Sequence, residues 1–431
     1  MPKQFLKLFE GESLFQKTLK RNQKTCNKQC VVSNTEQYFL AMDQIEELNA
    51  SRISHLLEPI GRNTAPAIAL ACLTVNHDEL ILVTPSDHLI KDEKAYIKAI
   101  EQAKELAKDG ELVTFGITPE YAESGFGYIE AEGLDVKAFH EKPDAKTAQM
   151  YVNAGNYYWN SGMFCFQAGV FLDELKVHSP NIFSAVLTAY ENANKEDLIR
   201  IKHEDMFVIP EESIDYAVME KSNKVKVVPI DMGWSDLGSF ESLEYELPIN
   251  QSVVNIGAEN NFIIASKKVA LIDVEDLIIV DTADALLVSK KGSSQKVKEV
   301  VKQLQFENSE LPNIHITAYR PWGTYTILDE LKGYKVKRIV VKPGKRLSLQ
   351  KHQHRSEHWV VVSGTALVTR GKEQYTIHAN ESTFISIGEV HRLENAGRIP
   401  LVMIEAQVGE YVGEDDIIRL EDDYKRTENH G

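Results

Sequence analysis

The chain has 431 residues, enough for about two or three domains, and no apolar run approaches the roughly 18 residues that a membrane-spanning helix needs. Hydrophobic residues make up 43% and charged residues 26%, which is globular usage and excludes a disordered or fibrous protein. The formal net charge of −16 argues against a protein whose general partner is nucleic acid or an anionic membrane.

The first 245 or so residues alternate short apolar runs with helical patterns. A buried-strand pattern over Leu80 to Thr84 is followed by helical spacing from Asp92 to Lys108. Further strands are predicted at Glu111 to Ile117, Val136 to His140, Met163 to Phe166 and Val225 to Ile230. This alternation predicts βαβ units and a largely parallel sheet, in which ligands collect at the carboxyl ends of the strands.

The pattern of predicted strands and helices changes after residue 250. Short β-prone pieces follow one another at close spacing up to about residue 290, and a basic helical stretch, Ser294 to Gln305, leads into a polar segment, Phe306 to Pro312. From about residue 320 short strands separated by Gly, Asn and charged turns predict a small double-sheet barrel. We therefore predict an α/β domain over residues 1–247, a β-rich connector and linker over 248–312, and a barrel domain over 313–431.

The four cysteines predict reduced thiols. Cys26, Cys30, Cys72 and Cys165 are too few and too scattered for a disulfide framework. The beginning of the sequence lacks the apolar segment of a signal peptide. Both features favour a cytoplasmic protein.

Two aspartates stand directly after predicted strands. Asp87 lies in Thr84-Pro-Ser-Asp-His88, and Asp236 lies in Gly233-Trp-Ser-Asp-Leu-Gly-Ser239, after the strand that ends at Ile230. Two carboxylates at one edge of a sheet could share Mg²⁺, which prefers hard oxygen ligands. The alternative is that each aspartate is a turn residue or a helix cap.

Two further segments of the α/β region offer polar groups to a ligand. The loop from Glu58 to Pro66 leads into an Ala-rich helix, and its backbone NH groups and Arg62 suit an anionic or hydrogen-bonding ligand, although Asn63 or Thr64 is equally suited to cap that helix. Glu141-Lys142 follows a strand and could contact sugar hydroxyls and a phosphate, or form a surface ion pair.

The barrel region carries a cluster of imidazoles. His352 and His354 alternate along one predicted strand, so both are expected to point inward, with Glu357 and His391 nearby. Such a set suits Zn²⁺ or another first-row divalent ion, while buried histidines with ordinary hydrogen bonds are the alternative. Five nearby cations could neutralise a substrate phosphate: Lys345, Arg346, Lys351, Arg355 and Arg392.

Motifs along nearly the whole chain match one family in order. They are Pro2-Lys-Gln-Phe5, Glu58-Pro-Ile-Gly-Arg-Asn-Thr-Ala-Pro66, Pro85-Ser-Asp-His88, Ser124-Gly-Phe-Gly-Tyr128, Glu141-Lys-Pro143, Trp159-Asn-Ser-Gly162, Trp234-Ser-Asp-Leu-Gly238, Gln350-Lys-His-Gln-His-Arg-Ser-Glu-His-Trp359, His391-Arg-Leu-Glu-Asn395 and Gly413-Glu-Asp-Asp-Ile417. The chain resembles a bifunctional mannose-1-phosphate guanylyltransferase/mannose-6-phosphate isomerase of the bacterial type.

The resemblance implies a nucleotidyltransferase domain that joins GTP and mannose 1-phosphate into GDP-mannose and releases pyrophosphate. It implies that Asp87 and Asp236 hold Mg²⁺ and that Lys3 lies near the reacting phosphates. It further implies that the loop with Arg62 and Asn63 faces the guanine nucleotide. The sugar-pocket residues implied in the same way are Gly127, Glu141 and Asn160, with Lys142 on the sugar phosphate.

For the carboxyl-terminal region the resemblance implies a cupin-like barrel that interconverts mannose 6-phosphate and fructose 6-phosphate. His352, His354, Glu357 and His391 would bind the isomerase metal, and Arg392 would contact the substrate. A metal ion can polarise the carbonyl while a base moves a proton between C1 and C2. Polysaccharide biosynthesis is the implied setting, and homo-oligomer formation stays open.

One departure from the family lies at the beginning of the sequence. Family members carry a strand and a glycine-rich loop ending in Arg-Leu-Trp-Pro before the Pro-Lys-Gln motif, whereas this sequence starts at Met1-Pro2-Lys3. Those glycines cradle the triphosphate, and the arginine is a catalytic cation. Without that central strand, apolar strand edges are expected to be exposed. In the barrel a milder departure is Ser386, where the family usually has Pro.

Three hypotheses follow. The first is a GDP-mannose-forming enzyme with an attached isomerase. The second is an isomerase whose amino-terminal domain is catalytically silent. The third is a non-catalytic module that binds a sugar nucleotide, against which Asp87, Asp236 and the histidine cluster all speak.

Overall fold

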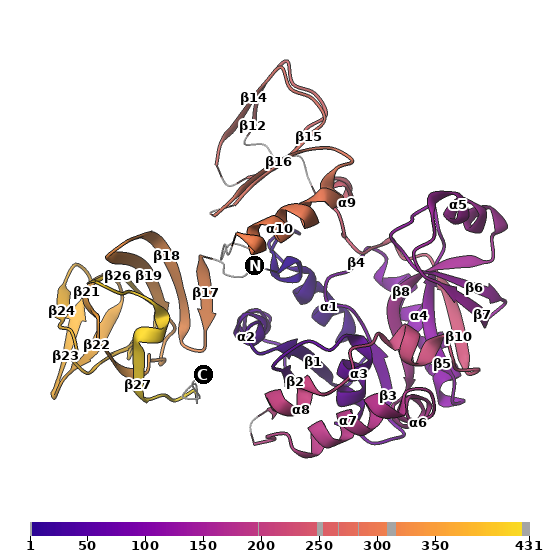
Figure 1. Cartoon of the computed structure of the whole chain (residues 1–431), viewed down its shortest axis with the longest axis horizontal. Helices are drawn as coiled ribbons and strands as arrows, with labels where there is room; N and C mark the ends of the chain where they lie inside the picture. Colours follow the sequence, from indigo (N-terminus) through magenta and orange to yellow (C-terminus); the bar gives the residue numbers. More distant parts are fainter. Residues whose placement is uncertain are drawn as a thin grey trace. The chain divides into compact units, whose positions relative to one another are not determined.

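The computed structural model describes residues 2–196, 198–247, 253–265, 267–282, 284–307 and 316–424. The chain divides into two compact units, Met1–Pro248 and Ile249–Gly431, each of which is described by itself (Figure 1). Among the described helices, none combines the length and apolar character needed to cross a membrane.

The first unit is an α/β structure. Its helices are η1 (Lys3–Phe5), α1 (Leu14–Asn22), α2 (Tyr38–Glu47), α3 (Thr64–Cys72), α4 (Glu93–Lys108), α5 (Ala145–Ala154), α6 (Ala168–His178), α7 (Pro180–Glu191), α8 (His203–Phe207), η2 (Asp215–Met219) and α9 (Phe240–Glu246). Its strands are β1 (Gln29–Asn34), β2 (Ile53–Glu58), β3 (Leu80–Val83), β4 (Leu89–Ile90), β5 (Leu112–Ile117), β6 (Tyr128–Glu132), β7 (Asp135–His140), β8 (Tyr157–Gln167), β9 (Ile199–Arg200), β10 (Val225–Ile230) and β11 (Trp234–Ser235).

The strands of this unit form two larger sheets and one short ribbon. A parallel three-stranded sheet has the order β1-β2-β9, and a six-stranded sheet has the order β3-β8-β5-β10-β7-β6. The prediction of a mostly parallel arrangement is wrong for the six-stranded sheet, where only β5 and β10 pair in parallel. The long strand β8 lies antiparallel to β3, β5 and β6, because apolar patterns predict strands but not their direction.

Helix α4 shows how the sequence builds the core of this unit. Asp92 caps its start by accepting hydrogen bonds from two backbone NH groups of the first turn, and Gly110 follows its end with a φ of +88°. Tyr96, Ile100 and Ala103 recur at helical spacing and are fully buried against the six-stranded sheet. The predicted helix is confirmed.

The strands β1 and β3 are both edge strands, and both line one cavity of about 1490 Å³. The apolar side chains that they offer to it, among them Val32 and Leu82, are only half-buried. The expected exposure of apolar strand edges stays a prediction, because both side chains also pack against buried core residues. The same cavity is also lined by the sugar-pocket residues predicted from the sequence. The part of the cavity between β1 and β3, called the slot below, is therefore continuous with the candidate site.

The second unit is mostly β-structure. Its first part contains β12 (Val253–Ile256), β13 (Phe262–Ala265), β14 (Val269–Ile272), β15 (Leu277–Asp281), β16 (Leu286–Lys290), η3 (Ser294–Lys296) and α10 (Val297–Phe306). Strand β12 pairs in parallel with β14, and β13 pairs in parallel with β15. Each of these strands therefore pairs with the strand that comes two positions later in the chain. This part is the predicted connector, whereas the predicted polar linker up to Pro312 continues outside the described residues.

The remainder is a double-sheet barrel. Its elements are β17 (Thr317–Arg320), β18 (Gly323–Leu331), β19 (Tyr334–Val341), β20 (Leu349–His352), β21 (Arg355–Ser363), β22 (Thr365–Arg370), β23 (Glu373–His378), β24 (Ser382–Ile385), β25 (His391–Glu394), β26 (Leu401–Gly409), η4 (Glu414–Asp416) and β27 (Ile417–Glu421). The sheets run β17-β18-β19-β26-β21-β24 and β23-β22-β25-β20-β27. Inward residues alternate with outward ones, and Trp359 and Leu393 belong to the apolar core at one end of the interior.

Candidate functional site

In the first unit, Lys3 contacts both of the predicted aspartates. Its Nζ lies 3.0 Å from Oδ2 of Asp87 and donates a 2.5 Å hydrogen bond to the backbone carbonyl of Asp236. The side chains of Lys3 and Asp87 are 30% and 37% exposed, so a ligand can reach them. The sequence separates Lys3 from Asp236 by 233 positions, and the fold brings them into contact.

A short ribbon brings together the two segments that carry the aspartates. Strands β4 and β11 pair antiparallel, with Trp234 opposite Ile90, so the residues flanking them lie at one end of the ribbon. The indole of Trp234 donates to Nδ1 of His88 at 3.1 Å. Burial lowers the pKa of His88, and the negative charges of Asp87 and Asp236 act on that pKa in the opposite sense. Nε2 of His88 lies 3.8 Å from Oδ1 of Asp87.

The predicted sugar-pocket residues come together across β8. Asn160 donates its backbone NH to the carbonyl of Gly127 at 2.9 Å, and a Cβ on Gly127 would lie 2.6 Å from Oε2 of Glu141. A side chain at position 127 would therefore displace that carboxylate. Asp215, which was not predicted from the sequence, accepts a 2.8 Å hydrogen bond from the amide of Asn160. Burial raises the pKa of Asp215. All four residues line the large cavity.

Three other predicted site residues contact neighbouring groups of the protein. The guanidinium of Arg62 donates to the backbone carbonyls of Met206 and Phe207 at the end of α8, so it ties the loop to that helix. Asn63 caps α3 through a 2.8 Å hydrogen bond from the backbone NH of Thr64, which is the alternative that the sequence left open. Lys142 is largely exposed and donates to Glu141 at 2.6 Å.

Glu58, at the end of β2, is a buried carboxyl group. It is 8% exposed, and its Oε1 has no hydrogen-bond partner among the described residues. Burial raises its pKa to about 7. The motif containing Glu58 was singled out from the sequence for Arg62 and Asn63, and nothing in its pattern showed that the carboxyl would be buried.

The barrel contains a compact donor cluster made by His352, Glu357 and His391. One ligand atom from each lies within 4.8 Å of the others, and all three side chains are at most 2% exposed. Nδ1 of His391 contacts the carbonyl of Glu389 at 2.8 Å, which directs Nε2 toward the cluster. Nε2 of His391 and both ring nitrogens of His352 lack well-formed hydrogen bonds among the described residues. Buried imidazole nitrogens left in this way fit a bound divalent cation.

Neighbouring side chains fix the carboxylate of Glu357. The indole of Trp359 donates to it at 3.0 Å and also to Glu405 at 3.1 Å, and the amide of Gln407 donates to the same two carboxylates. Burial and the neighbouring charge of Glu357 raise the pKa of Glu405 to about 8. Glu405 was not predicted from the sequence, because a lone Glu in an alternating strand carries no signal of its own.

His354 does not join the cluster. Strand β20 ends at His352 and β21 begins at Arg355, so the chain bends between them and the expected alternation stops. The side chain of His354 is 54% exposed, and its Nδ1 lies 2.8 Å from Oδ1 of Asp416. The prediction that His352 and His354 point inward together is corrected by this turn.

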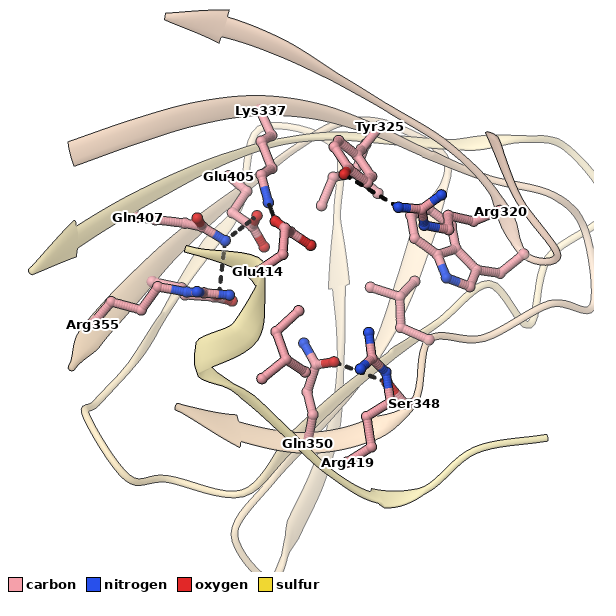
Figure 2. Close-up of a pocket in the computed structure, with 15 residues that line it drawn as sticks. Arg320, Tyr325, Lys337, Ser348, Gln350, Arg355, Glu405, Gln407, Glu414 and Arg419 are labelled. Atoms are coloured by element: carbon pink, nitrogen blue, oxygen red, sulfur yellow. Dashed lines mark hydrogen bonds and ion pairs between the residues drawn. The ribbon is translucent and has the colours of Figure 1, made fainter. Parts of the chain in front are cut away.

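The predicted contact of Arg392 with the substrate is likewise not supported by its position. His391 and Leu393 point inward from β25, so Arg392 points outward, where it forms a 2.8 Å ion pair with Glu421. The cations that do line the pocket beside Glu357 are Arg320, Lys337, Arg355 and Arg419 (Figure 2). Of these, only Arg355 was considered from the sequence.

A family described as nucleotidyl transferase matches residues 1–249, one described as MannoseP isomerase/GMP-like beta-helix domain matches residues 251–304, and one described as mannose-6-phosphate isomerase C-terminal matches residues 307–422. The xanthan biosynthesis protein XanB of Xanthomonas campestris pv. campestris is 44% identical over 99% of this chain and 95% of its own length. The mannose-1-phosphate guanylyltransferase of Escherichia coli K12 is 43% identical over 99% of this chain and 94% of its own length.

The chain belongs to the bifunctional-type mannose-1-phosphate guanylyltransferase family. The alginate biosynthesis protein AlgA of Pseudomonas aeruginosa is a further relative, 43% identical over 99% of this chain and 93% of its own length. The fold class predicted from the sequence, a nucleotidyltransferase followed by a β-rich connector and a cupin-like barrel, is confirmed. The predicted boundaries at residues 247 and 312 stay predictions.

Solved structures of similar proteins agree with this family membership. The mannose-6-phosphate isomerase of Helicobacter pylori is 44% identical and aligns with a TM-score of 0.52 over 54% of this chain and 95% of its own. The mannose-1-phosphate geranyltransferase of Thermus thermophilus is 31% identical, with a TM-score of 0.61 over 70% of this chain and 92% of its own.

Proposed function

We propose that this chain transfers GMP from GTP to mannose 1-phosphate in its first unit and interconverts mannose 6-phosphate and fructose 6-phosphate in its barrel. The family membership supports both reactions. The observation that carries the transferase is the contact of Lys3 with Asp87 and Asp236 at the rim of the large cavity. The observation that carries the isomerase is the buried cluster of His352, Glu357 and His391.

In the transferase the chain's own residues position two phosphorylated substrates. Asp87 and Asp236 would hold Mg²⁺, which supplies charge neutralisation of the phosphates when bound. Lys3 would place its ammonium beside those phosphates. Glu141 would accept hydrogen bonds from the sugar hydroxyls, and Asn160 would donate hydrogen bonds to them. An oxygen of mannose 1-phosphate attacks the α-phosphorus of GTP in line and pyrophosphate leaves, so positioning and charge supply most of the catalysis.

In the isomerase a proton must move between C1 and C2 of the open-chain sugar. The cluster of His352, Glu357 and His391 would hold Zn²⁺ or another divalent ion, which supplies polarisation of the carbonyl when bound. Glu357 is kept ionised for this role. Although burial alone would raise its pKa, the adjoining ring of His352 and the charges of His391 and Arg355 hold that pKa well below its usual range.

A second function, isomerisation alone, is favoured by the slot between β1 and β3. The residues of β1 and β3 that line this slot belong to two different sheets, the parallel sheet and the six-stranded sheet. A transferase site that bridges the slot is held less rigidly than one built on a continuous sheet.

Two assays on the full chain separate these functions. Pyrophosphate release from GTP and mannose 1-phosphate with Mg²⁺ measures the transferase, and fructose 6-phosphate formation measures the isomerase. D236N should remove only the first activity and H391A only the second. Isomerase turnover without detectable pyrophosphate release in the unmodified chain would favour isomerisation alone, and failure of both assays would overturn the proposal.

We also infer a cytoplasmic location from the chemistry of the thiols. All four cysteines of the chain are free, and Cys72 and Cys165 are buried. Burial raises the pKa of the Cys165 thiol to about 12, which keeps it protonated and unreactive. Free thiols are typical of a reducing compartment.

A further inference from the structure

The barrel pocket presents two cations on either side of one aromatic ring. The guanidinium of Arg320 lies 5.3 Å from the centre of the Tyr325 ring, and the ammonium of Lys337 lies 4.7 Å from the same centre. Figure 2 shows Tyr325 between these two side chains on the wall of the pocket that also contains Glu357. Two like charges held around one ring repel each other, and an anion bound near them offsets that repulsion.

The two cations differ in what neutralises them. Lys337 is 4% exposed and forms an ion pair with Glu414; burial would lower its pKa, but the charges of Glu405 and Glu414 raise it. Among the described residues, Arg320 donates to the carbonyl of Tyr319 at 3.1 Å and to the hydroxyl of Tyr325 at 3.4 Å. No carboxylate of the described residues pairs with Arg320.

Other charged groups of the pocket are already engaged. Arg355 lies 3.4 Å from Oε1 of Glu357 and donates to the carbonyl of Gly413 at 2.6 Å, so it supports the donor cluster and the turn at η4. Glu405 is tied to Trp359 and Gln407. Arg419 lines the same pocket from β27. An anion entering the pocket therefore meets in Arg320 a cation that no described carboxylate neutralises.

We propose that Arg320, with Lys337 beside it across Tyr325, binds the phosphate group of the sugar phosphate in the barrel. This inference rests on the proposed isomerase, because the phosphate must reach the pocket while the sugar carbons face the cluster of His352, Glu357 and His391. A guanidinium offers two parallel donors to phosphate oxygens, and its fixed charge does not depend on pH. The residue would thus select phosphorylated over unphosphorylated hexoses.

Titration calorimetry on the full chain tests this role. Mannose 6-phosphate and mannose are titrated into the wild-type chain, R320Q and R320K. The control variant is R338Q, which replaces Arg338, an exposed residue of β19. Losing a charge-assisted hydrogen bond should weaken binding of mannose 6-phosphate by roughly tenfold or more in R320Q. R320K should fall between R320Q and wild type, binding of mannose should not change, and R338Q should match wild type.

Kinetics then distinguish the inference from the proposed function. If R320Q binds mannose 6-phosphate as tightly as wild type, or weakens mannose equally, the phosphate role is wrong. If the wild-type chain shows no isomerase turnover with any added divalent ion, yet R320Q still loses affinity for mannose 6-phosphate alone, the proposed isomerase fails and the phosphate site stands. Should R320Q not fold, R320K carries the comparison, and its affinity must still lie below that of wild type.

Discussion

Nε2 of His352 lies 3.0 Å from Oε1 of Glu357, with both side chains almost fully buried inside the barrel. The two residues are adjacent in space because β20 and β21 are consecutive strands joined by a short bend. A buried imidazole beside a buried carboxylate is a costly arrangement unless the pair is shared with a further charge. A divalent cation bound by both residues and His391 would offset that cost.

We predict that H352A and H391A lose isomerase activity by at least about a hundredfold, because each removes one donor of the cluster. Formation of fructose 6-phosphate measures the effect, and bound metal is counted by elemental analysis of the purified chain. Pyrophosphate release serves as the internal control and should not change. Wild-type isomerase activity in both variants would refute the metal assignment.

We predict that H354A keeps isomerase activity within about threefold of wild type, since its side chain faces solvent and Asp416. The same assay and the same metal count apply, with H352A as the matched comparison. If H354A lost metal to the same extent as H352A, the turn after β20 would have to reorganise when metal binds. That result would restore His354 as a ligand.

We predict that K3M lowers transferase activity by about ten- to a hundredfold, because it removes the ammonium beside Asp87 and the donor to the carbonyl of Asp236. Pyrophosphate release at saturating Mg²⁺ measures the loss. The control variant is K7M, which replaces Lys7, an exposed residue that pairs with Glu47. Equal activity of K3M and K7M would contradict a role for Lys3 near the phosphates.

We predict that G127A raises the KM for mannose 1-phosphate and leaves the isomerase unchanged. The added Cβ would lie 2.6 Å from Oε2 of Glu141, so the carboxylate must shift from its place beside Gly127. A rise of about tenfold corresponds to one lost hydrogen bond to the sugar. An unchanged KM would show that Glu141 does not contact the substrate.

We predict that E58Q stabilises the chain at pH 8 more than at pH 5. The folded-state pKa of Glu58 is raised to about 7, above its ordinary value of 4.5. The unfolded chain therefore releases this proton at lower pH than the folded chain does. The loss of folding free energy that Glu58 causes in the wild type grows from about pH 4.5 to pH 7 and reaches its full size above pH 7. Its upper size is about 3 kcal/mol. Urea midpoints of E58Q and wild type at both pH values measure the difference, and an equal shift at pH 5 and pH 8 would contradict the raised pKa.

Local patterns predicted several elements of this protein because they are set by near neighbours in the chain. The helix from Asp92 to Lys108 is an example, since its cap, its apolar spacing and its terminal Gly110 all act within a few residues. His391 was predicted by residue type and motif, and its burial follows from the inward face of β25. The direction of β8 was not predictable in the same way, because an apolar run of residues is compatible with either direction.

The tertiary structure decided the functional surroundings. His354 left the cluster because β20 ends before it, at His352, and Arg392 points outward because the pleat alternates from His391. Arg320 and Lys337 converge on Tyr325 only through the pairing of β17, β18 and β19. By itself the sequence determined the family, the order of the elements and the residue types available for metal and phosphate. Which of those side chains share a pocket depends on long-range strand pairing, which no local pattern encodes.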